Sequence, residues 1–258
     1  MKLGRWIAGV LAAGLCLGAA GCSGGKDAGR EPDTSAAGPN QTQRPEETKK
    51  PTLPQPEEID PFPQEPEEPL EKLKGGNRIV IMTDIHYLSP GLTDMGSGFQ
   101  NMVEHGDGKL TNYIWEITDA AFEQIQLLSP DVLIITGDLT LEGERESHEA
   151  LARKLDEVQK NGIDVVVLPG NHDINNPSAS SYEGSARRPT EQVTPGEFAE
   201  IYEEFGYGQA WSRDPYSLSY TYDLDPSTRL MMLDSCQYDR GNKVGGMIKT
   251  ETYEWIED

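Results

Sequence analysis

Residues 163–173 read IDVVVLPGNHD, and this stretch decides the fold that we expect for the chain. Its first six residues are mostly β-branched and apolar, which is typical of a strand that other layers cover on both faces. Two earlier segments have the same character, residues 77–82 (NRIVIM) and residues 132–136 (VLIIT). Segments with helical periodicity lie between these predicted strands. The alternation of strands and helices predicts right-handed crossovers and an α/β fold with a parallel sheet.

Two helices are predicted between the strands, at residues 113–128 and 144–159. Their apolar residues recur every three or four positions, as on the buried face of a helix. On the first helix, the residues expected to face the sheet are Ile114, Ile117, Ala121, Ile125 and Leu128. On the second helix, they are Leu151, Leu155 and Val158. Beyond the third strand, the pattern predicts two further strands, at residues 217–222 and 229–233, and a helix from residue 250.

A short polar cluster follows each predicted strand. The clusters are Asp84-Ile85-His86, Gly137-Asp138 and Gly170-Asn171-His172-Asp173. The carboxyl ends of parallel strands lie at one edge of a sheet, where open α/β sheets place their ligand sites. Alternate residues at a strand end point to the same side, so Asp84 and His86 can converge on one ion. We therefore expect a single site that all three clusters build.

In this order, the three clusters resemble the pattern D-x-H, G-D, G-N-H-D of the calcineurin-like metallophosphoesterase superfamily. The resemblance covers residues 78–258 and implies a layered β-sheet core flanked by helices. It also implies a hydrolase that cleaves phosphodiesters or phosphomonoesters of small molecules through a hydroxide activated by two metal ions. The spelling of the motifs, D-I-H-Y with G-D-L-T and G-N-H-D, looks most like that of phosphodiesterase-type members.

The resemblance implies four metal ligands, which are Asp84, His86, Asp138 and Asn171. Asp84 and His86 would bind a first ion, Asp138 would bridge two ions, and Asn171 would bind the second. Two cations about 3.5 to 4 Å apart can lower the pKa of a shared water and stabilise both ends of an in-line displacement. Carboxylate, amide and imidazole ligands suit Mn, Fe, Zn or Ni better than Ca or Mg, so we expect two divalent ions of that group.

Two further residues are implied to be catalytic. His172 matches the histidine that stays off the metals and assists charge transfer to the leaving oxygen. Asp173 follows it directly, and we expect its carboxylate to orient the imidazole of His172, because a carboxylate can fix an imidazole tautomer.

One departure from the superfamily pattern concerns the later histidines. The chain has no histidine after His172, so a lone histidine and a G-H-x-H motif, which carry three expected ligands, are missing. We therefore expect the 258 residues to be part of a longer enzyme, with residues 78–258 an incomplete and inactive domain. The alternative is a non-catalytic surface lipoprotein that retains half of the metal site.

Five other polar residues can be interpreted either as functional residues or as ordinary core, loop or surface residues. His148 lies on the inward stripe of its predicted helix, so we expect a core or loop-anchoring histidine rather than a ligand. His105 is either a solvated loop residue or part of a pocket mouth. Arg187, Arg188 and Lys109 either bind phosphate or carry ordinary surface charge.

The charge balance excludes one class of partner. The chain has 22 basic and 44 acidic residues, a net charge of −22, and the 32 acids and 13 bases of residues 78–258 account for −19 of it. Binding to duplex nucleic acid requires clustered lysine and arginine, so we expect no such partner. An acidic surface also repels free phosphate esters unless cations occupy the site.

The N-terminal segment indicates export and anchoring. Residues 1–21 carry Lys2 and Arg5, then an apolar run, and end in small residues before Cys22, which is typical of a secretory signal peptide. Small residues directly before a cysteine resemble the lipobox of bacterial lipoproteins, which implies that Cys22 carries lipid. The alternative is ordinary signal cleavage with an unmodified Cys22.

A tether is expected between this anchor and the domain. Residues 22–77 are rich in Pro and Glu and poor in large apolar residues, so they cannot bury enough surface to fold. We therefore expect a domain held at the extracytoplasmic face of the cell membrane. Cys16 falls within the signal peptide and Cys22 carries the lipid, so Cys236 is left unpaired, and we expect a buried, unreactive thiol there.

Overall fold

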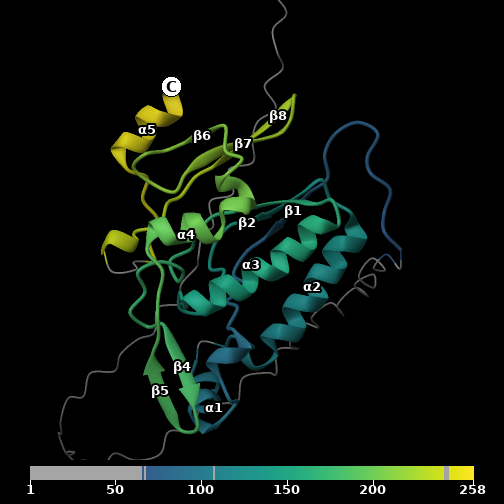
Figure 1. Cartoon of the computed structure of the whole chain (residues 1–258). Coiled ribbons are helices and arrows are strands. Elements are labelled where there is room, and N and C mark those ends of the chain that lie inside the picture. Colours follow the sequence, from purple (N-terminus) through teal and green to yellow (C-terminus); the bar gives the residue numbers. More distant parts are fainter. Residues whose placement is uncertain (1–65, 67, 107, 241–243) are drawn as a thin grey trace, which may run out of the picture. The chain divides into compact units, whose positions relative to one another are not determined.

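Three parallel strands form the central sheet: β1 (Ile79–Met82), β2 (Val132–Ile135) and β3 (Asp164–Val167), in the order β1-β2-β3 (Figure 1). Helix α2 (Ile114–Leu128) precedes β2, and helix α3 (Arg145–Lys160) connects β2 to β3. This arrangement confirms the predicted α/β fold with a layered sheet core and flanking helices. The computed structural model describes residues 66, 68–106, 108–240 and 244–258, and these residues belong to the unit Glu65–Asp258.

The register of the sheet sets the position of the functional site. Ile79 pairs with Val132, and Val132 pairs with Asp164. Met82, Ile135 and Val167 consequently end the three strands at the same level. The polar clusters that follow the strands therefore meet at one edge of the sheet.

The two faces of the sheet are buried to different extents. The helix α3 residues Leu151, Leu155 and Val158 are buried, as predicted. Strand β1, in contrast, lies at the sheet edge, and Ile79 and Ile81 are 41% and 51% exposed. The prediction that this strand is covered on both faces is therefore wrong, because the described residues leave the face with Ile79 and Ile81 largely exposed.

Helix α2 confirms the predicted inward face only in part: Ile114 and Ile125 are buried as predicted, and Ala121 and Leu128 are half-buried. Its buried residues are Ile114, Thr118, Phe122 and Ile125, whereas Ile117 is 43% exposed. The buried row follows spacings of four, four and three residues and includes a threonine. Thr118 is tolerated there because its hydroxyl donates a hydrogen bond of 2.6 Å to the Ile114 carbonyl.

The remaining elements surround this sheet (Figure 1). The helices are α1 (Ser97–Glu104), α4 (Pro195–Ile201) and α5 (Thr250–Glu257), and short helical turns span Pro90–Leu92, Thr111–Tyr113, Glu203–Tyr207 and Tyr238–Arg240. Strands β4 (Ser180–Glu183) and β5 (Ala186–Pro189) form an antiparallel hairpin. Strands β6 (Ser212–Arg213), β7 (Tyr220–Asp225) and β8 (Thr228–Met232) form a second antiparallel sheet.

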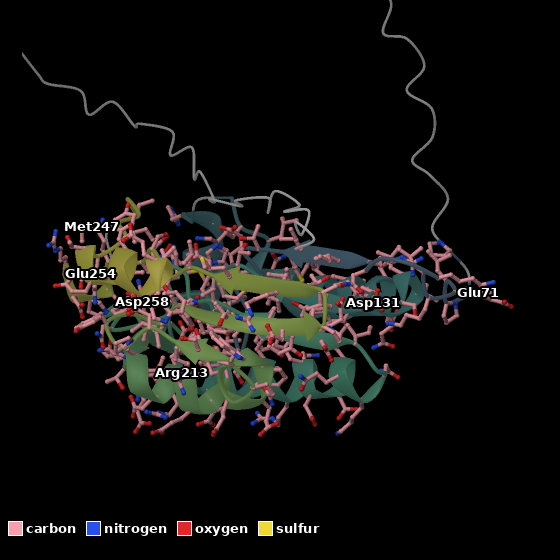
Figure 2. The ribbon with its side chains drawn as sticks, turned by 90° about the horizontal axis from the view of Figure 1, so that it is seen from above. Glu71, Asp131, Arg213, Met247, Glu254 and Asp258 are labelled. Atoms are coloured by element: carbon pink, nitrogen blue, oxygen red, sulfur yellow. The ribbon has the colours of Figure 1, made fainter. Side chains whose placement is uncertain are left out.

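The second sheet is joined to strand β3 by two tyrosines of β7. The Tyr220 hydroxyl donates to the Val167 carbonyl over 2.8 Å, and the Tyr222 hydroxyl donates to the Asp164 carboxylate over 2.8 Å. Figure 2, seen from above, shows Asp131 near one end of the domain and Met247, Glu254 and Asp258 near the other. The strands and helices run between these ends.

The N-terminal predictions fall mostly on residues that the structure does not describe. The signal peptide, Cys22 and the predicted tether up to residue 65 lie outside the described residues. The last residues of the predicted tether do contact the domain: the Leu70 amide donates to the Leu127 carbonyl over 2.8 Å, and Lys72 pairs with Asp131 over 3.2 Å. Within the described ranges, none of the helices has the length and apolar character needed to cross a membrane.

Candidate metal centre and adjoining pocket

The backbone at the sheet edge is unusual at three site residues. Asp84, His86 and Asp138 have positive φ angles of 56°, 50° and 48°. Asp and His tolerate this left-handed region better than most residues, but it still costs about 1 kcal/mol or more at each position. Backbone hydrogen bonds offset this cost: the His86 amide donates to the Asp138 carbonyl over 2.9 Å, and the Asp84 amide donates to the Gly137 carbonyl over 3.1 Å. The first two clusters are thus locked side by side.

Two glycines let the second and third clusters approach closely. Gly137 has a φ of 111°, and a Cβ there would lie 2.8 Å from Gly170 Cα. A Cβ on Gly170 would lie 2.1 Å from the Asp138 nitrogen. No side chain fits in either place, so both motifs require glycine at these positions.

Three of the predicted site residues bring potential metal ligands together. His86, Asp138 and His172 each offer one ligand atom, and these atoms lie within 4.8 Å of one another. His86 Nε2 lies 3.9 Å from Asp138 Oδ2 and 3.7 Å from Asp84 Oδ1. The rings of His86 and His172 meet edge to face with centroids 4.8 Å apart. The His172 amide also donates to Asp138 Oδ1 over 3.0 Å, which holds the carboxylate in place.

The electrostatics of this group fit a divalent cation. Burial lowers the pKa of His86, with the positive charge of Lys109 adding to the effect, so the ring is neutral and able to act as a ligand. Its buried Nδ1 has no hydrogen-bond partner among the described residues. Burial raises the pKa of the Asp138 carboxyl, and the charge of Asp173 adds to this. A bound cation would offset the cost of keeping Asp138 ionised.

The other two predicted ligands lie at the margin of the group. Asp84 is exposed, and its Oδ2 accepts a hydrogen bond of 2.6 Å from the Thr83 hydroxyl. Asn171 is half-buried in the turn directly before His172. The number and identity of the ions, and the part of Asp84 and Asn171 in binding them, stay predictions.

His172 is held by contacts that fix its protons. Its Nδ1 lies 2.8 Å from the Leu141 carbonyl, which can only accept, so this nitrogen carries a proton. Glu142 Oε2 lies 3.3 Å from the same nitrogen. Burial alone would lower the pKa of His172, but the hydrogen bond to Glu142 and the charges of Asp138 and Glu142 outweigh it and raise the pKa to about 9. A ring protonated at neutral pH is suited to donate a proton.

The predicted contact between Asp173 and the ring of His172 is wrong. The Asp173 carboxylate is fully buried and accepts from Gly170 N at 2.7 Å, Leu139 N at 3.0 Å, Thr140 N at 2.9 Å and Thr140 Oγ1 at 2.8 Å. It fastens the third cluster to the loop after β2. Glu142 contacts the ring instead, and the sequence carried no signal for this role because Glu142 belongs to no motif.

The interpretation of His148 as a core residue is confirmed. The residue has no exposed surface, its Nδ1 lies 3.0 Å from the Tyr202 hydroxyl, and its Nε2 lies 2.9 Å from the Asp173 carbonyl. Cys236 is half-buried, with its thiol 3.2 Å from the Pro169 carbonyl, and burial raises the pKa of this thiol. An unreactive thiol is expected from such surroundings.

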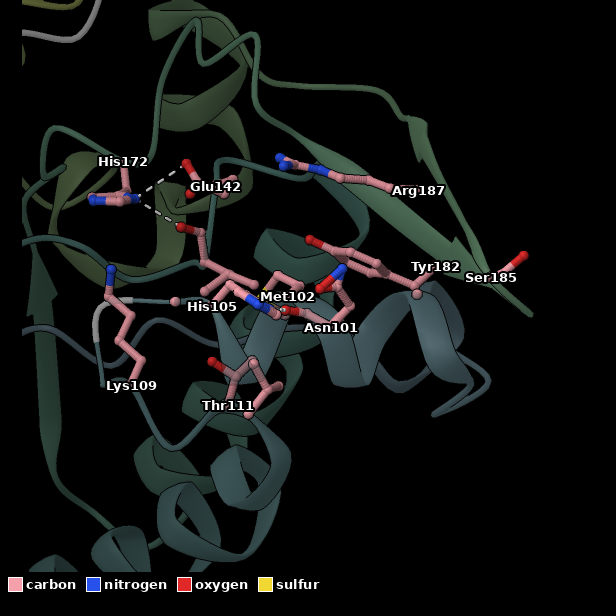
Figure 3. Close-up of a pocket in the computed structure, with 14 residues that line it drawn as sticks. Asn101, Met102, His105, Lys109, Thr111, Glu142, His172, Tyr182, Ser185 and Arg187 are labelled. Atoms are coloured by element: carbon pink, nitrogen blue, oxygen red, sulfur yellow. Dashed lines mark hydrogen bonds and ion pairs between the residues drawn. The ribbon is translucent and has the colours of Figure 1, made fainter.

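A cavity of about 710 Å³ opens beside His172 (Figure 3). Its polar lining includes His105, Lys109, Glu142, His172 and Arg187. Its apolar lining consists of Met102, Val103, Leu141 and the ring of Tyr182. Helix α1 and the β4–β5 hairpin therefore supply one wall, and His172, beside the candidate metal centre, lies on the other.

Comparison with known proteins identifies the family. A sequence model of the calcineurin-like phosphoesterases matches residues 77–258. The chain therefore belongs to the calcineurin-like phosphoesterase family, whose members hydrolyse phosphoesters with the help of divalent metal ions. None of the curated proteins with which the chain was compared is a significant match.

Proposed function

We propose that the protein hydrolyses phosphodiesters of small molecules at a centre of two divalent ions held by Asp84, His86, Asp138 and Asn171. The observation that carries this proposal is the convergence of His86, Asp138 and His172 at the level ends of three parallel strands. The domain is otherwise strongly acidic. Cations at this edge would therefore remove the electrostatic repulsion of an anionic substrate. The cavity of about 710 Å³ beside His172 leaves room for a substituent on each side of a diester.

The ions would supply a nucleophile at neutral pH and stabilise charge on the phosphoryl oxygens. The chain's own residues then complete the reaction. Water oxygen bonds to phosphorus while the bond from phosphorus to the departing alcohol breaks, and the proton lost by the water passes to solvent. His172 donates a proton to the departing oxygen. The Leu141 carbonyl holds the Nδ1 proton, so the proton that moves is the one on Nε2.

The test uses the protein expressed from its whole gene, with metal content measured by mass spectrometry. We expect two divalent ions for each chain and faster turnover of bis-p-nitrophenyl phosphate than of p-nitrophenyl phosphate with added Mn. A non-catalytic lipoprotein would turn over neither ester with Mn, Fe, Zn or Ni. That result would overturn the proposal.

We also propose that the protein is a lipoprotein at the extracytoplasmic face of the membrane, anchored through Cys22. The small residues before Cys22 and the Pro- and Glu-rich segment after it support this. Cys22→Ser should block incorporation of a fatty-acid analogue, and the matched control Cys236→Ser should keep it. Persistent labelling of Cys22→Ser would contradict the proposed anchor.

A further inference from the structure

Arg187 faces the cavity, whereas its neighbour Arg188 does not. In the β4–β5 hairpin, Arg187 pairs with Tyr182 and Arg188 pairs with Ser181. Paired residues of an antiparallel ladder share a face, and successive residues alternate. Tyr182 and Arg187 accordingly line the cavity together (Figure 3). Arg188 lies on the opposite face and forms an ion pair of 3.3 Å with Glu183.

The guanidinium of Arg187 is held by uncharged oxygens. Its Nε donates to the Ser180 hydroxyl over 2.8 Å, and its Nη2 donates to the Ser178 carbonyl over 2.8 Å. Within the described ranges, no carboxylate forms an ion pair with it, although residues 78–258 include 32 acidic residues. Its charge is thus fixed in position but not neutralised, which is the state of an arginine prepared for an anion.

The wall that carries Arg187 is anchored to a distant part of the chain. The Gly98 amide of helix α1 donates to the Gly184 carbonyl over 2.8 Å, and the Gly184 amide donates to Asp94 over 2.7 Å. The rings of Phe99 and Tyr182 meet edge to face with centroids 5.8 Å apart. A buried cluster around these rings includes Leu88, Leu92 and Leu141. Arg187 is therefore presented by a packed element, with little cost of ordering on binding.

The lining of the cavity combines polar side chains, among them Lys109 and Glu142, with apolar surface. His172 lies at the metal-centre end, and Arg187 lies on the hairpin wall (Figure 3). Met102, Val103 and the ring of Tyr182 supply apolar surface to the same cavity. A ligand that fills this space has a reacting phosphate near His172, an organic middle part, and a second anion that reaches Arg187.

We propose that Arg187 binds a second phosphate on the departing alcohol, so that the preferred substrate is a phosphodiester whose leaving group is itself phosphorylated. The inference rests on the proposed phosphodiesterase function and adds the substrate class. Arg187 is then a specificity residue, because it selects between leaving groups without contacting the reacting phosphorus.

The test compares two dinucleotides that differ by one phosphate. When the bond from phosphorus to the 5′ oxygen breaks, the departing nucleoside of thymidylyl-(3′→5′)-thymidine is neutral, whereas that of its 3′-phosphorylated form carries the second phosphate. We expect the wild type to prefer the phosphorylated form in kcat/KM. Arg187→Ala should lose roughly 10- to 100-fold on that form, as expected for a charged hydrogen bond, and less than about 3-fold on the neutral one. The control Arg188→Ala should change neither.

Failure of the inference differs from failure of the proposed function. If Arg187→Ala loses kcat/KM equally on both dinucleotides, or on neither, the second-phosphate site is overturned, whereas the proposed phosphodiesterase function is unaffected. If the wild type hydrolyses no diester, the proposed function fails, and binding of thymidine 3′,5′-bisphosphate measured by calorimetry decides the inference. Roughly 10- to 100-fold weaker binding by Arg187→Ala than by Arg188→Ala supports the site. Equal affinities overturn it.

Discussion

The turn at residues 170–173 separates two regions that use the same residue types in opposite ways. On its inner side, His148 and the Asp173 carboxylate are fully buried, and each is satisfied by several hydrogen bonds. On its outer side, His172 lines the cavity, and His172 and Asp138 border the candidate metal centre. The inner region holds the loops together. The outer region keeps side-chain atoms that are available to bind a metal ion or a substrate.

The pKa values of the two histidines express this difference. Burial lowers the pKa of His148 to about 4, against 6.5 for an ordinary histidine. Contacts with Glu142 and Asp138 outweigh burial at His172 and raise the pKa to about 9. At neutral pH one ring is uncharged and the other protonated. A histidine near a site is thus classified by its partners and burial, because its presence alone fits either role.

Asp138→Asn should produce the largest change, because it removes the charge that would hold two cations close together. We expect metal affinity to fall at least about 100-fold, since even residues that only support metal ligands cost 10- to 100-fold, and the rate to fall with it. Metal titration and turnover of bis-p-nitrophenyl phosphate measure both. The control Asp119→Asn, at an exposed pair with Lys154, should leave both unchanged. Undiminished activity of Asp138→Asn would remove the two-metal mechanism.

His172→Ala should lower the rate by roughly 10²- to 10⁴-fold, the range expected for loss of a proton-transfer group. Both ions should remain if His172 only donates a proton. The loss should also shrink for leaving groups such as p-nitrophenol that depart without a proton. Metal loss equal to that of Asp138→Asn would instead make His172 a ligand, a role that its position within 4.8 Å of His86 and Asp138 also permits.

Asp173→Asn tests the inner region. Each carboxylate oxygen of Asp173 accepts from at least one backbone amide, so either orientation of an asparagine amide sets its NH₂ group against an N–H donor. We expect a loss of about 2 to 4 kcal/mol in the free energy of unfolding, measured by urea denaturation. The exposed control Asp156→Asn, which removes a surface pair with Lys160, should cost less than about 1 kcal/mol. If both variants lose less than about 1 kcal/mol in the free energy of unfolding, the buried hydrogen bonds of Asp173 are not needed for stability.

His148→Gln should give the smallest and most pH-dependent effect. The folded pKa of about 4 lies below the ordinary 6.5, so the stability that neutral His148 provides is present above pH 6.5 and is lost as pH falls toward 4. Between pH 7 and pH 5 the free energy of unfolding of the wild type should therefore fall by about 2 kcal/mol more than that of the variant. Glu144, whose pKa burial raises to about 7, contributes with the opposite sign, but it does so in both proteins and cancels in the difference. If the free energy of unfolding of the two proteins depends on pH in the same way, His148 is not a buried neutral histidine.

The sequence predicted the outer region in large part because its signals are local. Each polar cluster follows a β-branched strand directly, and level strand ends bring Asp84, His86, Asp138 and His172 to one edge without detailed knowledge of packing. The same local periodicity placed His148 in the core. Gly137 and Gly170 are required by a close approach that lies within the two motifs themselves.

The tertiary structure decided the features that depend on contacts between distant segments. The partners of Asp173 come from the loop after β2, the exposure of Ile79 and Ile81 depends on which strand lies at the sheet edge, and the inward row of α2 depends on the layer beneath it. Arg187 faces the cavity and Arg188 faces away from it. This difference depends on the docking of the hairpin against helix α1, about 90 residues earlier in the chain. Periodicity gives the order of faces along one segment, but the identity of what covers each face is set by the packing of all segments together.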